Sequence, residues 1–82
     1  MKYHIVSVND LAVGSFMRPF FAPSVGAAVR SFGDEVKRVD SEMAKHPEDY
    51  EMWKIGEFED DGGEVRPVSL ERLARGVDYV QK

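Results

Sequence analysis

The chain has 82 residues and a formal net charge of −4, with 11 Lys or Arg against 15 Asp or Glu. This size indicates one domain, residues 1–82, whose core is thin because such a chain buries only about 60% of its unfolded surface. The absence of cysteine excludes disulfides, thiolate metal sites and cysteine nucleophiles. A thin core without such support favours self-association, so we expect a homodimer or a higher homo-oligomer.

No stretch of the chain approaches the roughly 18 to 20 apolar residues that span a bilayer. The first residues, MKYHIVSVND, lack the apolar segment of a signal peptide. We therefore expect a soluble cytoplasmic protein with no membrane partner. The negative net charge argues against a general binder of polyanions, because nonspecific affinity for nucleic acid comes mainly from neutralised phosphates. Such binding would need a local basic patch.

Two strands are predicted in the first 21 residues. Residues 3–8 alternate between two faces and are rich in β-branched and aromatic side chains. The stretch NDLAVGS supplies turn residues. Residues 16–21 then predict a returning strand, which Pro19 restricts to an edge or bulged position because proline donates no hydrogen bond to a sheet.

A helix of about four turns is predicted after Pro23. Ser24 is suited to cap it, because a serine hydroxyl can accept a hydrogen bond from a free N–H of the first turn. Gly26 and Gly33 each lower helix stability by up to about 1 kcal/mol relative to alanine, and Gly33 offers an alternative end to the helix. The apolar residues recur at helical spacing: Val25, Ala28, Val29, Phe32, Val36 and Val39.

The second half of the chain predicts a short turn, a hairpin and a second helix. Asp40 or Ser41 would cap one helical turn, which should end before the proline of KHPED. Residues 50–58 predict the third strand, EDDGGE predicts a tight acidic turn, and VRPVS predicts a short returning strand. Ser69 is expected to cap a final helix over residues 70–76, followed by DYVQK as a tail or a last strand.

The predicted order is β-β-α-β-β-α, which indicates an α+β fold. It contains a small antiparallel sheet of about four strands with helices packed on one face. Phe20 and Phe21 alternate along their strand, so one of them should point away from the helices. An outward aromatic on a small sheet is an oligomer contact or a ligand platform. Both faces of the third strand carry apolar residues, so the sequence leaves open which face is uncovered.

The sequence shows no motif for catalysis, metal binding or cofactor binding. A zinc site needs three or four ligands at short spacing, whereas His4 and His46 are the chain's two histidines. The run EFEDDGGE lacks the spacing of a calcium loop. No serine lies in a GxSxG motif, and no glycine-rich phosphate-binding motif occurs. We therefore expect no enzyme activity, no metal and no cofactor.

One group of residues combines aromatic rings with basic side chains. Phe16, Arg18 and Phe20 share a face of their predicted strand, because side chains alternate. Single-stranded nucleic acid is bound by such pairings, with bases stacked on rings at about 1 to 3 kcal/mol each and cations on phosphates. A small sheet also buries aromatics, so the same rings could form the core. The candidate nucleic-acid-binding residues are Phe16, Arg18, Phe20, Trp53, Lys54, Arg66 and Arg30.

Four stretches also occur in the order and spacing of a known family. They are PFFAP at residues 19–23, RSFGD at residues 30–34, KHPED at residues 45–49 and WKIGEF at residues 53–58. In this pattern the chain resembles the small nonstructural protein of gokushovirus-type Microviridae, which are single-stranded DNA phages.

The resemblance implies a phage protein of the host cytoplasm that binds DNA early in infection or during packaging, with no catalytic role. The family is likened to the microvirus protein that switches replication from duplex synthesis to single-strand synthesis and packaging. The resemblance also favours Phe32 in the core and a helix end at Gly33 and Asp34. The alternative function is a protein-interaction module that contacts the replication initiator or the procapsid through the acidic hairpin, residues 57–64. In a third hypothesis, the outward aromatics are all contacts within an oligomer.

Overall fold

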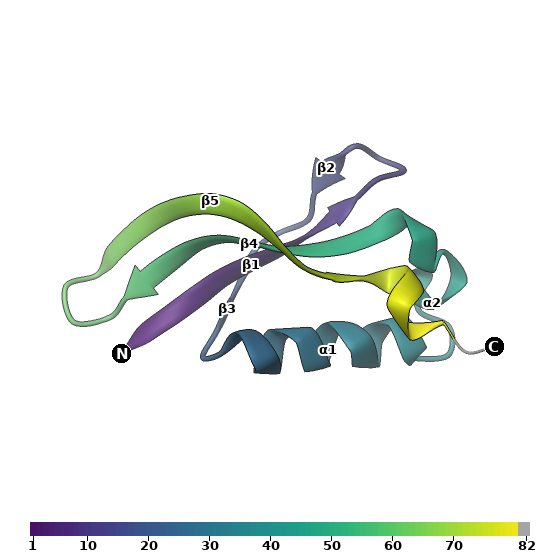
Figure 1. Ribbon diagram of the computed structural model, residues 1–82, viewed down its shortest axis with the longest axis horizontal. Coiled ribbons are helices and arrows are strands. Elements are labelled where there is room, and N and C mark those ends of the chain that lie inside the picture. The colour runs from purple at the N-terminus through teal and green to yellow at the C-terminus, as the bar shows by residue number, and fades with distance from the viewer. Residues whose placement is uncertain (81–82) are drawn as a thin grey trace.

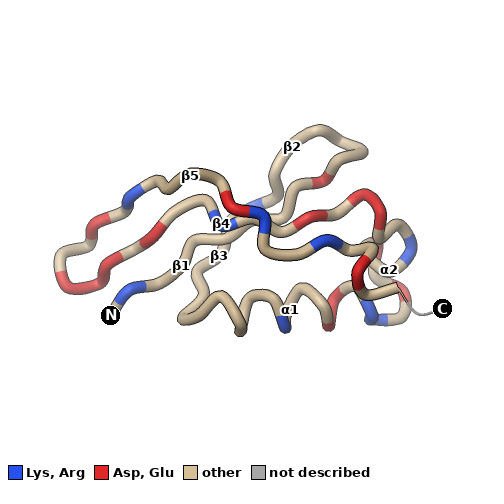
Figure 2. Tube along the Cα trace, in the orientation of Figure 1, with Lys and Arg blue, Asp and Glu red and all other residues tan. Residues whose placement is uncertain are grey.

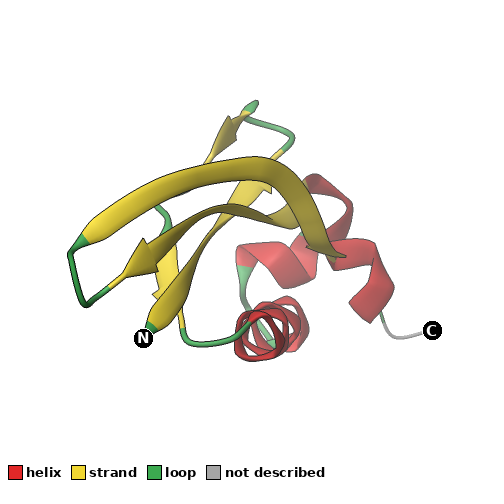
Figure 3. Cartoon of the chain, turned by 60° about the vertical axis from the view of Figure 1, so that its left-hand side comes forward, coloured by secondary structure: helices red, strands yellow, loops and turns green. Residues whose placement is uncertain are grey.

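The computed structural model describes residues 1–80 and shows a five-stranded antiparallel sheet with one long helix (Figure 1). The sheet order is β2-β1-β4-β5, and β3 also pairs with β1. The α1 helix runs beneath one face of the curved sheet, as the turned view shows (Figure 3). The predicted α+β fold with a small antiparallel sheet is therefore confirmed. The strands are β1 (Lys2–Asp10), β2 (Ser15–Phe16), β3 (Phe20–Ala22), β4 (Tyr50–Glu59) and β5 (Glu64–Arg75), and the helices are α1 (Val25–Lys37), α2 (Glu42–Lys45), η1 (Pro47–Asp49) and η2 (Gly76–Tyr79).

The β1 strand organises the sheet, because both of its edges are paired. It pairs with β4 from Lys2 opposite Glu59 to Asp10 opposite Tyr50. Its other edge pairs with β2 and β3, which are two pieces of one returning strand interrupted at residues 17–19. This interruption at Pro19 confirms the predicted edge strand, since proline leaves a gap in the hydrogen-bond ladder.

The α1 helix begins after Ser24 as predicted, but it does not end at Gly33, which was one of the predicted ends. The Ser24 hydroxyl accepts a hydrogen bond from the Ala27 N–H at 3.1 Å. The helix then continues through Gly33 to Lys37, so a helix end at Gly33 and Asp34 is wrong. Gly33 is needed for packing instead, because a Cβ at this position would lie 2.8 Å from the Tyr79 ring.

The connector after α1 contains the predicted helical turn. The Ser41 side chain accepts from the Ala44 N–H at 2.9 Å and donates to the Glu35 carbonyl oxygen at 2.6 Å. The resulting α2 turn ends at Lys45, ahead of Pro47. Ser41 is buried and satisfied at both of its hydrogen bonds, so it fixes the connector against the end of α1.

The predicted helix over residues 70–76 is wrong, because these residues belong mainly to β5, which runs for 12 residues. The β4–β5 register shifts twice, between Met52 and Trp53 and between Lys54 and Gly56. Extra residues on β5 at these bulges break the alternation of a regular strand, and the apolar spacing then imitates that of a helix. Pro67 is tolerated within β5 because this strand lies at the edge of the sheet.

The core lies between α1 and the sheet face that the helix covers. Phe32 is 4% exposed, and its ring meets the Tyr79 ring edge-on at 5.9 Å between centroids. Tyr79 belongs to η2, so the end of the described chain closes one side of the core. The buried apolar residues of this cluster are Val6, Val8, Ala22, Ala28, Phe32, Val36, Met52 and Ala74.

Candidate nucleic-acid interface

The cross-strand register separates the residues of the sheet into two faces. Directly opposed residues of antiparallel strands lie on the same face, and neighbours along a strand alternate. Val8 opposes Met52, and both belong to the core beneath the sheet. Tyr3 opposes Phe58 on the other side, because the extra β4 residue Ile55 at the register shift between Ile5 and Val6 reverses the alternation along β4. We call the side that carries Tyr3 and Phe58, away from α1, the outer face.

The outer face carries a cluster of three aromatic rings at the hairpin end of the sheet. The Tyr3 and Phe58 rings lie 6.2 Å apart, and Phe21 meets Phe58 edge-on at 5.5 Å. Phe21 is 55% exposed. As the alternation predicts, Phe20 and Phe21 lie on opposite sides of the sheet, and Phe21 is the outward member. An aromatic ring that is supported by a neighbouring ring and still open to solvent can receive a planar ligand.

A groove of about 390 Å³ lies beside this cluster, and we call it the outer groove. Gly56 forms part of it, and a Cβ there would lie 2.8 Å from the Arg66 carbonyl oxygen, so only glycine lets β4 and β5 approach this closely. Apart from Arg66, the lining residues carry no charge. They are Ile5, Pro19, Phe21, Ile55, Gly56, Val65, Arg66 and Pro67.

The predicted aromatic residues are not brought together. Phe16 opposes Asn9 and Trp53 opposes Ser7, so both lie on the outer face, away from the lining of the outer groove. Phe20 opposes Val6, a core residue, and therefore lies on the α1 side. Phe20 therefore does not share the face of Phe16, and it is not buried in the core either, because it is 38% exposed.

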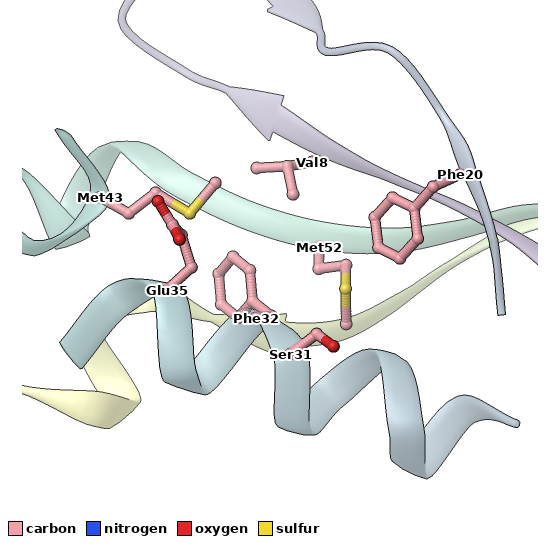
Figure 4. Close-up of a pocket in the computed structure, with 7 residues that line it drawn as sticks. All are labelled: Val8, Phe20, Ser31, Phe32, Glu35, Met43 and Met52. Carbon is pink, nitrogen blue, oxygen red and sulfur yellow. The ribbon is translucent and has the colours of Figure 1, made fainter. Parts of the chain in front are cut away.

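The surroundings of Phe20 are shown by a smaller cavity of about 180 Å³ between the sheet and α1 (Figure 4). Its lining is Val8, Phe20, Ser31, Phe32, Glu35, Met43 and Met52. Glu35 is the charged member, and its carboxylate accepts hydrogen bonds from Arg38 at 2.7 and 3.1 Å. These bonds lower the pKa of Glu35. The cavity is therefore a continuation of the apolar core, and its one charged side chain, Glu35, is paired with Arg38.

Two of the predicted phosphate contacts, Lys54 and Arg66, are held by one carboxylate. The Lys54 ammonium donates to Glu57 at 2.9 Å, and the Arg66 guanidinium lies 3.4 Å from the other oxygen of the same carboxylate. Lys2 reaches Glu57 at 3.6 Å. The hydrogen bond from Lys54, with the charges of all three cations, holds the pKa of Glu57 below its usual range.

The other two predicted cations, Arg18 and Arg30, differ in position. Within residues 1–80, neither lies within 4.0 Å of a carboxylate, whereas seven of the ten Lys and Arg residues there do. Arg18 precedes Pro19, which lines the outer groove. Arg30 is exposed on α1, beneath the opposite face. Among the predicted cations, Arg18 is therefore the unpaired charge beside the outer groove.

The distribution of charge in Figure 2 shows basic and acidic residues interspersed along the chain, with acidic residues gathered at the turn between β4 and β5. Two acidic sets bring possible metal-ligand atoms within 4.8 Å of one another: His46, Glu48 and Asp49, and Glu59, Asp60 and Asp61. Most of these side chains are exposed to solvent. Solvated acidic clusters are ordinary on a surface, and these two carry no argument for a metal.

Tyr3, Phe21 and Phe58 are the residues of the site that the sequence reasoning did not select. Tyr3 lies near the start of β1 and Phe58 near the end of β4, and only the register from Lys2 opposite Glu59 brings them together. The alternation at Phe20 and Phe21 was the available signal, since it required one of the two rings to point outward.

Comparison with known proteins gives one match. Residues 3–79 match the family model described as phage ORF5 protein. No curated protein and no solved structure matches the chain. Within residues 1–80, no helix has the length and apolar character needed to cross a membrane.

Proposed function

The chain belongs to the phage ORF5 protein family, and we propose that this phage protein binds single-stranded DNA in the host cytoplasm, during genome replication or packaging. The proposal assigns it no catalytic role. Most residues that line the outer groove are apolar, and they supply neither a nucleophile nor a carboxylate or imidazole for proton transfer.

The observation that carries the proposal is the exposed aromatic cluster at the outer groove. Phe21 is more than half exposed, and its ring also packs against Phe58 with the two ring planes nearly perpendicular, which restricts its orientation. Unpaired bases stack on such rings, because every base has an aromatic face. Duplex DNA offers these faces only at its ends, so the arrangement favours single strands.

The electrostatic part of the site is small. Arg18 is next in sequence to Pro19 of the groove, and Arg66 lines the groove but its guanidinium contacts Glu57 and Glu64. We therefore propose that stacking supplies most of the affinity. For single strands the logarithm of affinity falls with the logarithm of salt concentration by about 0.7 per neutralised phosphate, so we expect a shallow dependence.

The test is fluorescence anisotropy with a labelled single-stranded oligonucleotide and the matching duplex, at low and physiological salt. The expected result is a preference for single strands that is weakened by Phe21→Ala. A matched control is Leu11→Ala, which truncates another exposed apolar residue, away from the groove. Equal affinity of the Phe21→Ala variant and the original chain would contradict the site, and no binding at low salt would contradict DNA as the direct ligand.

The alternative proposal is a protein-interaction module that contacts the replication initiator or the procapsid. The net charge of −4 and the many paired cations favour it, as does the acidic turn between β4 and β5. Co-purification with and without nuclease separates the two functions, since a complex bridged by DNA is lost on digestion. A homodimer or higher oligomer also remains a proposal, and light scattering over a concentration series tests it.

A further inference from the structure

Three cations from three different strands surround the Glu57 carboxylate. Lys2 comes from β1, Lys54 from β4 and Arg66 from β5, at 3.6, 2.9 and 3.4 Å from its oxygens. The group lies at the hairpin end of the sheet. There Lys2 and Glu57 lie on the same side of the sheet as the core residue Val6, which is the α1 side. Glu57 therefore supplies one negative charge to a group that carries three positive charges.

The three cations are not equivalent. Lys54 and Glu57 are largely covered, with side chains 13% and 17% exposed, and they form the shortest contact. Lys2 and Arg66 are about half exposed and lie farther from the carboxylate. Within residues 1–80, Lys2 has no other carboxylate within 4.0 Å, whereas Arg66 also reaches Glu64 at 3.5 Å. Once Lys54 is paired with Glu57, Lys2 and Arg66 keep most of their capacity to bind another anion.

We propose that Lys2 and Arg66 form a phosphate-binding site that the Glu57 carboxylate occupies when no ligand is bound. The two oxygens of a carboxylate resemble two oxygens of a phosphate, and guanidinium groups bind both in the same geometry. Glu57 thus competes with phosphate for the same two cations. The inference rests on the proposed function in one respect, because the phosphate is taken to come from a DNA backbone.

The position of Arg66 connects this site with the outer groove. Arg66 lines the groove, and its guanidinium contacts Glu57 on the α1 side. It belongs to β5, the edge strand of the sheet. Because β1 and β4 lie between β3 and β5, a strand whose base stacks on Phe21 would bring a phosphate from farther along its backbone, rather than the adjacent one, over this edge towards Arg66 and Lys2.

The acidic neighbours of the site limit its strength. Glu59 and Asp60 lie on the same hairpin, and the Met1 amino group contacts both, at 3.1 and 2.5 Å. Glu64 contacts Arg66. These negative charges oppose the approach of a polyanion, so we expect weak binding of phosphate in the original chain. Removal of the Glu57 carboxylate should strengthen this binding, and the gain should be measurable at low salt, where electrostatic interactions are least screened.

The experiment compares Glu57→Gln with Glu51→Gln in binding to a labelled single-stranded oligonucleotide across a salt series. Glu51 is a matched control because it is covered to a similar extent, with 19% exposure, and contacts one cation, Arg72, at 3.4 Å. We expect Glu57→Gln to bind about five times more tightly at low salt, with a salt slope steeper by about 0.7 for each phosphate gained. Glu51→Gln should change affinity by less than about twofold. Equal affinities and slopes for the two variants would overturn the proposal and leave Glu57 with a stabilising role alone.

Two further arms separate this inference from the proposed function. In the Glu57→Gln background, Arg66→Gln should remove the gain in affinity for the oligonucleotide. If Glu57→Gln does not fold, Arg66→Gln is made in the original chain, where it should lower the salt slope. An unchanged slope in that variant would overturn the inference. Pyrophosphate, followed by NMR shifts of the Lys2 and Arg66 signals, supplies phosphate without bases. If no form of the protein binds DNA but Glu57→Gln takes up pyrophosphate more tightly than Glu51→Gln, the proposed function fails and the phosphate site stands.

Discussion

The two faces of the sheet are built from alternate residues of the same strands, and they differ in what covers them. On the α1 side, Val6 and Met52 are fully buried against the helix. On the outer face, Phe21 and Val65 are 55% and 61% exposed beside a groove. Apolar content alone therefore does not distinguish a core from a binding surface. The presence of a covering element does, and that element is α1.

The largest effect is expected on the covered face. Phe32→Ala removes a nearly buried ring that contacts Tyr79 and lines the cavity under the sheet. It should lower the free energy of unfolding by about 3–5 kcal/mol. A urea melt measures this loss. A loss below about 1 kcal/mol would mean that α1 does not exclude solvent from this face. The two faces would then not differ in how far they are buried.

The outer face should give the opposite pattern when a ring is removed. Phe21→Ala should weaken binding of single-stranded DNA by about 1–3 kcal/mol, the usual contribution of one stacked base. Its effect on stability should be much smaller than that of Phe32→Ala, because Phe21 is already more than half exposed. Anisotropy and a urea melt on the same preparation give both numbers. Phe16→Ala, on the outer face but outside the groove, should affect binding less.

The sequence predicted the covered face better than the open one. Val25 to Val36 follow helical spacing and Ser24 caps the helix, and these local signals survive in the structure. Residues 70–76 carried a similar spacing and are mostly strand, because pairing with β4 and its bulges overrides local preference. Lys54 and Arg66 were expected to be available to phosphate, and their joint contact with Glu57 depends on a register that no local pattern reveals.

A smaller effect is expected at the start of the covering helix. Ser24→Ala removes the hydroxyl that accepts from the Ala27 N–H. The loss should be about 1 kcal/mol in the free energy of unfolding, because the other contacts of α1 stay in place. Ser31→Ala is a suitable control, since Ser31 is also an exposed serine but lies inside the helix. If both substitutions lower stability equally, the effect does not arise from the cap.

Acidification should have the smallest effect, and it concerns the hairpin end of the sheet. Lys54, Lys2 and Arg66 keep the pKa of Glu57 lower in the folded chain than in the unfolded chain. The unfolded chain therefore binds this proton first, and the stabilisation is complete above the ordinary glutamate pKa of about 4.3. It is lost as the pH falls through the lowered folded pKa. Urea midpoints of the original chain and of Glu57→Gln should accordingly differ most at neutral pH and converge as the pH falls below the ordinary glutamate pKa, whereas a constant difference would show that the charge of Glu57 contributes nothing to folding. Glu35 also has a lowered pKa, through Arg38, but it is present in both proteins and cancels in the comparison, so any convergence reports on the cations around Glu57.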